Sequence, residues 1–530
     1  MTTHAHATAR LHELLERYRR PAVSLGSVLC DDHPTTDIAL TVVGSDLGVE
    51  TVTFGELRQR SERLAVGLAA LGLERGDRVA TLMGKSADLV TTLLAVWRCG
   101  AVHVPLFTAF APPAIDLRLA ASGARIVVVD DAQRSKLDDT GFEGPVLIAG
   151  DVPGGSTGNG DPPDVALAGD DPFIVNYTSG TTGPPKGVAT PVWSIAAMRF
   201  YLERGLGVED DDVYWNAADP GWAYGLFYAV VAPLAAGRPT TLLAAPFAPE
   251  LAWQVLADLE VTNLAAAPAV YRALRSACPE GRGSSLRRLS SAGEPLDADT
   301  LGWARDALGI EIRDHYGQTE LGMAIANAWH PELRQAVKLG SMGTPLPGWT
   351  VQVLRDDGAV AGPGELGQVA VDVTASPAMP FSGYVDAPER TAKRLSADGR
   401  WYLTGDTATR DADGYFFFAA RDDDVIIAAG YRIGPFEIES VLVEHPDVVE
   451  AAVVGIPDER GGEVIAAFVV LRAGARADDS LSSEFQQLVK GRNAAHAYPR
   501  VVRFVDALPR NPSGKVQRYL LRAPEGEGHR

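Results

Sequence analysis

Short β-branched runs alternate with helical segments along residues 78–129, and this alternation limits the fold more than any other feature of the chain. The alternating segments are, in order, Arg78–Met83, Asp88–Cys99, Ala101–Pro105, Ala114–Ser122 and Arg125–Val129. Strands that alternate with helices usually pair in parallel, because each helix carries the chain back across the sheet. The sequence therefore predicts an α/β protein with a doubly wound parallel sheet. A further helix is predicted over Thr51–Leu73.

The stretch Tyr177–Val188 reads YTSGTTGPPKGV and follows a short apolar strand predicted over Phe173–Asn176. Glycines allow the backbone to approach an anion, and backbone N–H groups and hydroxyls supply donors. Lys186 adds a point charge suited to phosphate. The Walker pattern is excluded because Gly187 follows the lysine where Ser or Thr is required. The stretch predicts a phosphate-binding loop; the alternative is a flexible surface turn.

Polar residues follow three other predicted apolar segments. The strand Leu286–Gly293 ends in GEP, the strand Ile310–Asp314 is followed by HYGQTE, and residues 219–225 read DPGWAYG. Ligands in open parallel sheets bind beyond the carboxyl ends of the strands. These polar segments and the glycine-rich loop are therefore predicted to share one site.

The composition excludes several classes of partner. A formal charge of −20 over 530 residues argues against general nucleic-acid binding, so an anionic ligand needs local basic or N–H groups. No apolar run approaches the ~20 residues of a membrane span, so no integral membrane segment is expected. Three scattered cysteines fit no zinc or redox pattern and favour a reducing cytoplasm. The amphipathic segment Thr2–Arg20 is interpreted as a docked helix rather than a transit peptide.

Five ordered stretches resemble the motifs of the adenylate-forming superfamily, which includes acyl-CoA synthetases, luciferases and peptide-synthetase adenylation domains. They are TSGTTGPPKG (178–187), HYGQTE (315–320), YLTGD (402–406), RDDDVIIAAGYRIGPFEIES (421–440) and PSGKVQR (512–518). Each alone has an ordinary alternative: Tyr316 as a core tyrosine, Asp406 as a turn residue, Lys515 as a solvated lysine. ADPGWAYG (218–225) and the GEP turn resemble the acetyl- and medium-chain acyl-CoA synthetase branch.

The resemblance implies a large N-terminal domain, residues 1–422, with doubly wound α/β subdomains, a β-rich subdomain and the ATP and acyl sites. It implies a small, mobile α+β C-terminal domain, residues 423–530, that rotates about a hinge at Asp423. Such enzymes use ATP, Mg²⁺ and CoA in two steps. A carboxylate attacks the α-phosphate of ATP to give an acyl-adenylate and pyrophosphate, and a thiol then displaces AMP.

The resemblance also assigns roles to residues of this chain. Lys515 bridges the attacking carboxylate and the α-phosphate, and Glu320 is the Mg²⁺ ligand. Nucleotide contacts are implied for Thr178, Ser179, Gly180, Thr181, Thr182, Gly183, Lys186, Gly293, Glu294, Pro295, Asp314, His315, Tyr316, Gly317, Gln318, Thr319, Asp406 and Arg421. On the thiol side, Gly430 lines the pantetheine channel beside Tyr431 and Arg432, and Lys490 lies near the CoA nucleotide.

The acyl pocket is implied to be formed by Trp222, Ala223, Tyr224, Ala292 and Gly317. Acetate-specific relatives carry tryptophan at the position of Gly317 and bulkier residues at Ala223 and Ala292. Each buried methylene contributes ~0.8 kcal/mol, which favours a medium-chain or bulkier hydrophobic acid.

Two alternatives stay open. Basic residues near the C-terminus (Arg492, Arg500, Arg503, Arg510 and Arg518) fit an acidic acyl-carrier protein as acceptor in place of CoA. Ala420 and Ala429 replace a glycine and a serine usual beside the hinge, so an enzyme that performs one half-reaction with a partner is the other alternative. The sequence leaves the oligomeric state open, a homodimer included.

Overall fold

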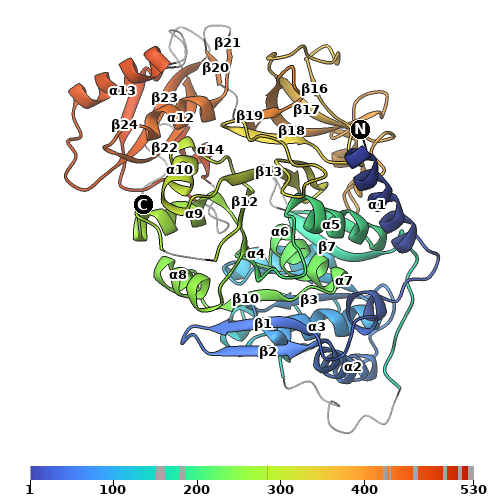
Figure 1. Ribbon diagram of the computed structural model, residues 1–530. Helices are drawn as coiled ribbons and strands as arrows, with labels where there is room; N and C mark the ends of the chain where they lie inside the picture. Colours follow the sequence, from blue (N-terminus) through green and yellow to red (C-terminus); the bar gives the residue numbers. More distant parts are fainter. Residues whose placement is uncertain are drawn as a thin grey trace.

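The computed structural model describes residues 2–150, 161–178, 185–282, 285–421, 424, 426–428, 431–457, 463–492, 498–510 and 516–522. A large N-terminal domain contains two extensive sheets, and a smaller C-terminal domain lies beside strand β19 (Figure 1). Within the described residues, no helix is both long and apolar enough to cross a membrane.

The first sheet has six strands in the order β6-β5-β3-β4-β7-β8. Its strands are β3 (Arg78–Leu82), β4 (Val102–Pro105), β5 (Ile126–Val129), β6 (Val146–Ile148), β7 (Pro172–Thr178) and β8 (Lys186–Pro191). All neighbours are parallel except β7 and β8. Ile126 and Val128 belong to the core cluster that contains helix α3 (Ala87–Arg98), whereas Val127 and Val129 pack with α4 (Pro112–Ser122). Helices therefore cover both faces, which confirms the doubly wound prediction.

The second sheet has thirteen strands in the order β16-β17-β18-β19-β15-β14-β13-β12-β11-β9-β10-β1-β2. Its parallel part runs from β1 to β13, and the strands from β14 to β19 pair antiparallel as the β-rich part. The strands are β1 (Ile38–Gly44), β2 (Val49–Thr53), β9 (Tyr214–Asn216), β10 (Thr240–Ala244), β11 (Asn263–Ala266), β12 (Arg288–Ala292), β13 (Ile312–Gln318), β14 (Gly322–Ala326), β15 (Ser341–Pro345), β16 (Val351–Leu354), β17 (Gly367–Asp372), β18 (Trp401–Arg410) and β19 (Phe416–Arg421).

Two predicted boundaries are wrong. The segment predicted as one helix over Thr51–Leu73 begins with β2, and α2 (Phe54–Ala70) starts only after Thr53, which forms a capping box with Glu56. The strand predicted to end at Asp314 continues to Gln318, so most of HYGQTE lies on β13 rather than in a loop. Its polar residues are accommodated in a strand because β14 pairs with it through a hairpin.

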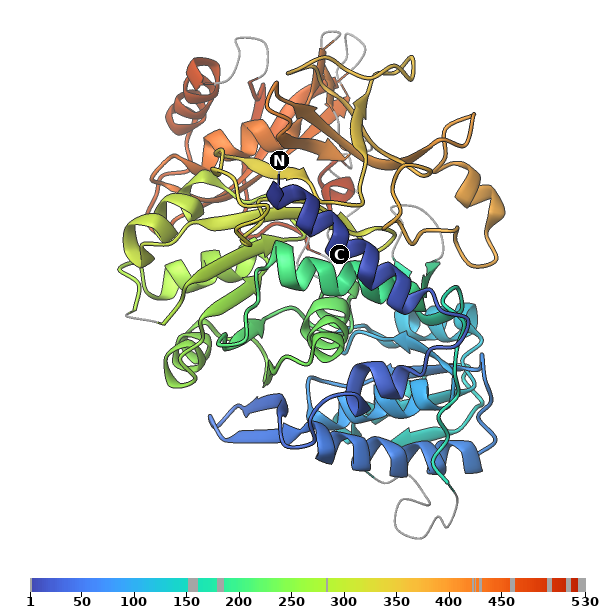
Figure 2. The same cartoon turned by 45° about the vertical axis from the view of Figure 1, so that its right-hand side comes forward.

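Helices fill the space around the sheets. The amino-terminal helix α1 (Thr2–Tyr18) packs on α5 (Ile195–Phe200), and Arg10 bonds to Glu203 at 2.8 Å, as expected for a docked helix (Figure 2). The other helical elements of the large domain are η1 (Ser27–Asp31), η2 (Asp131–Leu137), η3 (Val192–Ser194), η4 (Tyr201–Gly205), α6 (Ala223–Gly225), η5 (Leu226–Val231), α7 (Ala232–Ala236), α8 (Pro249–Asp258), α9 (Pro268–Ala277), α10 (Ala298–Trp303), η6 (Ala304–Leu308) and α11 (Pro388–Ala392).

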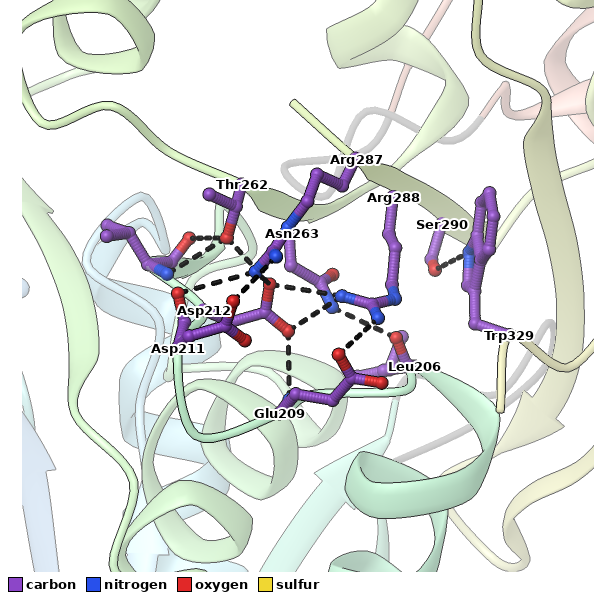
Figure 3. A network of polar contacts seen from close by, with 11 residues as sticks. Leu206, Glu209, Asp211, Asp212, Thr262, Asn263, Arg287, Arg288, Ser290 and Trp329 are labelled. Carbon is purple, nitrogen blue, oxygen red and sulfur yellow. Dashed lines mark hydrogen bonds and ion pairs between the residues drawn. The ribbon is translucent and has the colours of Figure 1, made fainter. Parts of the chain in front are cut away.

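A network of polar contacts connects the amino ends of β9, β11 and β12, on the side of the sheet opposite to the carboxyl ends of these strands (Figure 3). The fully buried carboxylate of Asp212 accepts hydrogen bonds from Arg287 (2.7 Å), Arg288 (3.0 Å) and the Thr262 hydroxyl (2.7 Å). Charge-assisted bonds of this kind offset the cost of burying the carboxylate. This edge of the sheet is therefore structural.

The C-terminal domain contains a hairpin and a three-stranded sheet in the order β22-β23-β24. Two separate core clusters, formed by residues between 426 and 521, stabilise it. Its elements are β20 (Ile426–Ala428), β21 (Tyr431–Ile433), α12 (Pro435–Val443), β22 (Val448–Pro457), β23 (Glu463–Leu471), α13 (Asp479–Arg492), β24 (Val501–Phe504) and α14 (Arg518–Leu521).

Candidate active site

The two described ends of the glycine-rich stretch, Thr178 on β7 and Lys186 on β8, are antiparallel partners. Ser179, Gly180, Thr181, Thr182 and Gly183 lie outside the described residues. Strand β8 thus fixes Lys186 at the carboxyl end of β7, where the sequence predicted a ligand.

Lys186 and Glu320 meet at Tyr384. The Lys186 ammonium lies 5.1 Å from the centroid of the Tyr384 ring, and the Tyr384 hydroxyl donates to Glu320 Oε1 at 2.7 Å. Burial and the Glu320 charge raise the pKa of Tyr384 to about 12, so its hydroxyl stays a donor. Partial burial, followed by the Arg394 charge, lowers the pKa of Lys186, and the Glu320 carboxylate opposes this shift. A lysine and a carboxylate are thus held on one tyrosine.

Asp406 on β18 is the centre of a second group. It is 5% exposed and accepts hydrogen bonds from the Tyr316 hydroxyl and Gln318 Nε2, each at 2.6 Å. Arg421 Nε lies 3.6 Å from the other carboxylate oxygen, because Asp406 and Arg421 are partners across β18 and β19. The structure therefore brings together four residues that the sequence placed at the nucleotide.

Glu320 joins the two groups through the chain, since it lies two residues beyond Gln318. Mg²⁺ is usually bound through one or two carboxylates, with phosphates and water completing the octahedron. Among the described residues, no cluster of three His, Cys, Asp or Glu side chains is placed to hold a metal. A single buried carboxylate beside a lysine fits a magnesium ion whose other ligands come from a triphosphate, and Glu320 is the residue that would hold it.

Two residues of this region were not predicted. Tyr384 pairs with Val188 through an isolated bridge, and Arg394 donates to the Thr404 carbonyl oxygen at 3.0 Å. Arg394 Nη1 would lie 2.4 Å from a Cβ at Gly405, so the glycine gives the guanidinium room. No motif marks either residue, and only the packing of the 379–395 segment against β8 and β18 reveals them.

Several other residues predicted to contact the nucleotide lie outside these two polar groups. Glu294 Oε1 accepts from the Ala269 N–H (3.0 Å) and from Arg272 (3.2 Å), so this carboxylate caps α9. Gly293 adopts a φ of +101°, which favours glycine, and Pro295 comes two residues later. Asp314 lines a small pocket with Lys338 and Ser341, on the face of β13 opposite to His315.

The residues predicted for the acyl pocket divide between two core clusters. Trp222 packs on Phe107 and Phe110 in the cluster of the six-stranded sheet. Ala223, Tyr224 and Ala292 belong to the large cluster between the sheets, which also contains Tyr316. Gly317 is required by a close approach, since a Cβ there would lie 2.0 Å from the Gly322 carbonyl oxygen.

A small cavity adjoins this region. Its lining comes from β8, α5, η5 and the turn after β13, and includes Met198, Phe227, Tyr228, Thr319 and Glu320. Thr319 and Glu320 therefore face an apolar space on one side of the candidate site.

The predicted thiol-side residues are described only in part. Asp423, Gly430 and Lys515 lie outside the described residues, as do the side chains of Tyr431 and Arg432 on β21. Lys490 is described: its ammonium lies 3.9 Å from the centroid of the Tyr498 ring, and the Arg500 guanidinium lies 4.0 Å from the same centroid.

Comparisons with known proteins show which family the chain belongs to. Residues 30–384 match the family described as AMP-binding enzyme, and residues 437–515 match the AMP-binding enzyme C-terminal domain. Acetyl-coenzyme A synthetase of Bacillus subtilis (strain 168) is 35% identical over 90% of this chain and 85% of its own length. The human protein named acyl-coenzyme A synthetase ACSM4, mitochondrial, is 35% identical over 90% of this chain and 84% of its own.

The crystal structure of the Brucella canis acyl-CoA synthetase superposes with a TM-score of 0.74 at 41% identity, covering 95% of this chain and 94% of that one. Family, relatives and fold therefore agree with the motifs. The chain belongs to the AMP-binding enzyme family, in its acyl-CoA synthetase branch, and is an AMP-forming acid–thiol ligase.

Proposed function

We propose that the chain activates a medium-chain or bulkier hydrophobic carboxylic acid with ATP and transfers the acyl group to CoA. The observation that carries this proposal is the pair of polar groups Lys186–Tyr384–Glu320 and Tyr316–Asp406–Gln318, which are linked along the chain by Gln318 and Glu320. Three unpaired, buried cysteines suit a reducing cytoplasm as the compartment.

The first group suits the triphosphate. Lys186 and Arg394 lie close enough for Arg394 to lower the pKa of Lys186, so two cations face one region. They oppose the negative charge that accumulates on the leaving pyrophosphate. Magnesium held at Glu320 would supply further neutralisation of that charge. Tyr384 orients the carboxylate and keeps the lysine beside it.

The second group suits the nucleoside. A buried carboxylate such as Asp406 can accept hydrogen bonds from ribose hydroxyls, while the Tyr316 ring next to it offers an apolar face to a purine. The Tyr316 hydroxyl and Gln318 Nε2 donate to Asp406 Oδ2, and Arg421 Nε lies 3.6 Å from Oδ1, so side chains from β13 and β19 hold this carboxylate. Lys515 is proposed to join the acid and the α-phosphate, two anions that otherwise repel.

Rotation of residues 423–530 about Asp423 is proposed to withdraw Lys515 after adenylation and to open a channel for the thiol. Gly430 and Lys490 are proposed to lie along the path of CoA. The separate cores of the C-terminal domain support this, because a domain with its own core can move as a unit.

The proposed acid is larger than acetate because Ala223 and Ala292 are small and the neighbouring cavity is apolar. Gly317 supports this less, since its lack of a side chain is required by the Gly322 carbonyl. Octanoate is therefore expected to exceed acetate in kcat/KM, and equal values would contradict the size argument.

Pyrophosphate exchange with a panel of acids tests the proposal, because it reports adenylation without an acceptor. Acid-dependent exchange that is lost in Lys186→Met and Asp406→Ala is expected. Acid-independent exchange, or none with any acid, would contradict it.

A carrier protein is the second candidate acceptor. Lys490 and Arg500 lie on one aromatic ring, Tyr498, in a chain of strongly negative charge, and such a basic surface suits an acidic partner. Saturable thioester formation with free CoA supports the leading proposal, whereas turnover only with a phosphopantetheinylated carrier protein supports this one.

A further inference from the structure

A chain of hydrogen bonds runs from the buried core to the predicted acyl pocket. The Tyr224 hydroxyl lies 3.3 Å from the Tyr201 hydroxyl, which lies 2.6 Å from His315 Nδ1. The other ring nitrogen, His315 Nε2, lies 3.3 Å from the Asn327 carbonyl oxygen. Tyr201 and His315 are 1% and 2% exposed, whereas Tyr224 is partly exposed. Tyr224 is thus the most exposed of the three hydrogen-bonded residues.

The donor and acceptor of each of these hydrogen bonds follow from the Asn327 carbonyl, which can only accept. Burial lowers the pKa of His315 to about 3, so its ring is neutral and carries a single N–H. The Asn327 carbonyl can only accept, which places that hydrogen on Nε2 and makes Nδ1 an acceptor. Tyr201 must then donate to Nδ1. Having one hydrogen, Tyr201 accepts from Tyr224, and Tyr224 is left with lone pairs alone.

The register of the strands places this chain at the predicted pocket. Ala292 and His315 are partners on β12 and β13, and Asn216 lies on the same face two strands away. Asn216 is 1% exposed, and its Nδ2 has no hydrogen-bond partner in the described part of the chain. The hydrogen-bonded residues Tyr224, Tyr201 and His315 and the Asn216 side chain therefore lie on one face of the sheet.

We propose that the acid carries a hydroxyl or neutral amino group that donates a hydrogen bond to Tyr224. This inference rests on the proposed adenylation function and refines its substrate class. A charged ammonium group is not expected, because Asp314 faces the other side of β13 and burial raises the pKa of that carboxyl well above its usual range. The substrate is thus a hydrophobic acid with one polar, uncharged group along its chain or ring.

Pyrophosphate exchange with matched acids tests the proposal in the full-length enzyme. The panel contains octanoate, its 5-, 6- and 7-hydroxy derivatives, and the corresponding oxo acids, which accept but cannot donate. At one position, the hydroxy acid is expected to exceed the oxo acid in kcat/KM by about threefold to tenfold, the contribution of one neutral hydrogen bond. The hydroxyaryl series, benzoate with 3- and 4-hydroxybenzoate, covers a ring substrate.

Two variants separate a directed acceptor from a merely polar pocket. Tyr224→Phe is expected to reduce the hydroxy-to-oxo ratio of kcat/KM to about one. Tyr201→Phe frees the Tyr224 proton to donate outward, so the oxo acid is expected to gain relative to the hydroxy acid. Tyr271→Phe, which removes a buried hydroxyl bonded to Ser290 O on the other side of the sheet, is the matched control and should leave the ratio unchanged.

The outcomes separate the hydroxyl preference from adenylation itself. Exchange with octanoate but no hydroxyl preference at any position or ring would overturn this inference and leave the adenylation proposal intact. A hydroxyl preference that persists in Tyr224→Phe would also overturn it. No exchange with any acid would overturn both.

Discussion

Tyr384 is expected to orient Glu320, the proposed Mg²⁺ ligand, although no sequence motif contains this tyrosine. Its hydroxyl donates to Glu320 at 2.7 Å, and the two side chains are buried, at 5% and 9% exposure. Tyr384→Phe removes that donor and keeps the ring. Because little water reaches the carboxylate, the loss is uncompensated, and a hydrogen bond to a charged group is worth about 1.5–3 kcal/mol.

Loss of a partner that orients a metal ligand typically costs ~10–100-fold in metal affinity or activity. We therefore expect Tyr384→Phe to need about that much more Mg²⁺ for half-maximal pyrophosphate exchange. Tyr384→Leu also removes the ring beneath Lys186, a cation–π contact worth about 0.5–2 kcal/mol. It should lower kcat/KM for ATP by about twofold to thirtyfold beyond Tyr384→Phe.

The assay is exchange rate against Mg²⁺ concentration at saturating acid, with urea unfolding of each variant as a check on folding. Tyr415→Phe removes a similar hydroxyl bond, to the Ala336 carbonyl at 2.7 Å, and is the control. The reasoning would be refuted if Tyr384→Phe left the Mg²⁺ dependence of exchange unchanged and Tyr384→Leu had the same kcat/KM for ATP as Tyr384→Phe.

Three further predictions concern other parts of the molecule. Asp212→Ala leaves Arg287 and Arg288 without their buried partner and should lower the free energy of unfolding by about 3–5 kcal/mol in urea, with KM for ATP unchanged. Asp406→Asn should reduce kcat/KM for ATP by about tenfold to a hundredfold, and should narrow the preference for ATP over 2′-deoxy-ATP if the carboxylate binds the ribose. Burial lowers the pKa of His103 from 6.5 to about 3, so as the pH falls through 6.5 only the unfolded chain gains the proton and stability is lost. Between about pH 7.5 and about pH 5.5, His103 should lower the free energy of unfolding by about 1.4 kcal/mol. Urea unfolding of His103→Asn should no longer show this contribution.

Residue patterns and family resemblance contribute to the predicted site in different ways. The composition of its own loop, after the short apolar strand Phe173–Asn176, indicates Lys186, whereas Asp406 is indicated only by the resemblance of YLTGD to a family motif. The assignment of HYGQTE to a loop is wrong because its polarity hides the pairing of β13 with β14. Tyr384 and Arg394 could not be found, since they reach the site only through contacts between segments about 200 residues apart or across a bend in the β-rich part.

The position of His315 in a nucleotide motif does not match the contacts that its side chain makes. The sequence placed it among the nucleotide contacts, yet in the fold its ring turns inward to Tyr201 and Asn327. Its neighbour Tyr316 points the other way, to Asp406, because successive residues of a strand face opposite sides. One strand thus supplies Tyr316 and Gln318 to the proposed nucleotide group and His315 to the side of the proposed acyl pocket. A change of acid preference through Tyr201 or Tyr224 is therefore expected to leave the ATP contacts untouched, since the two sets of side chains share a backbone but not a hydrogen bond.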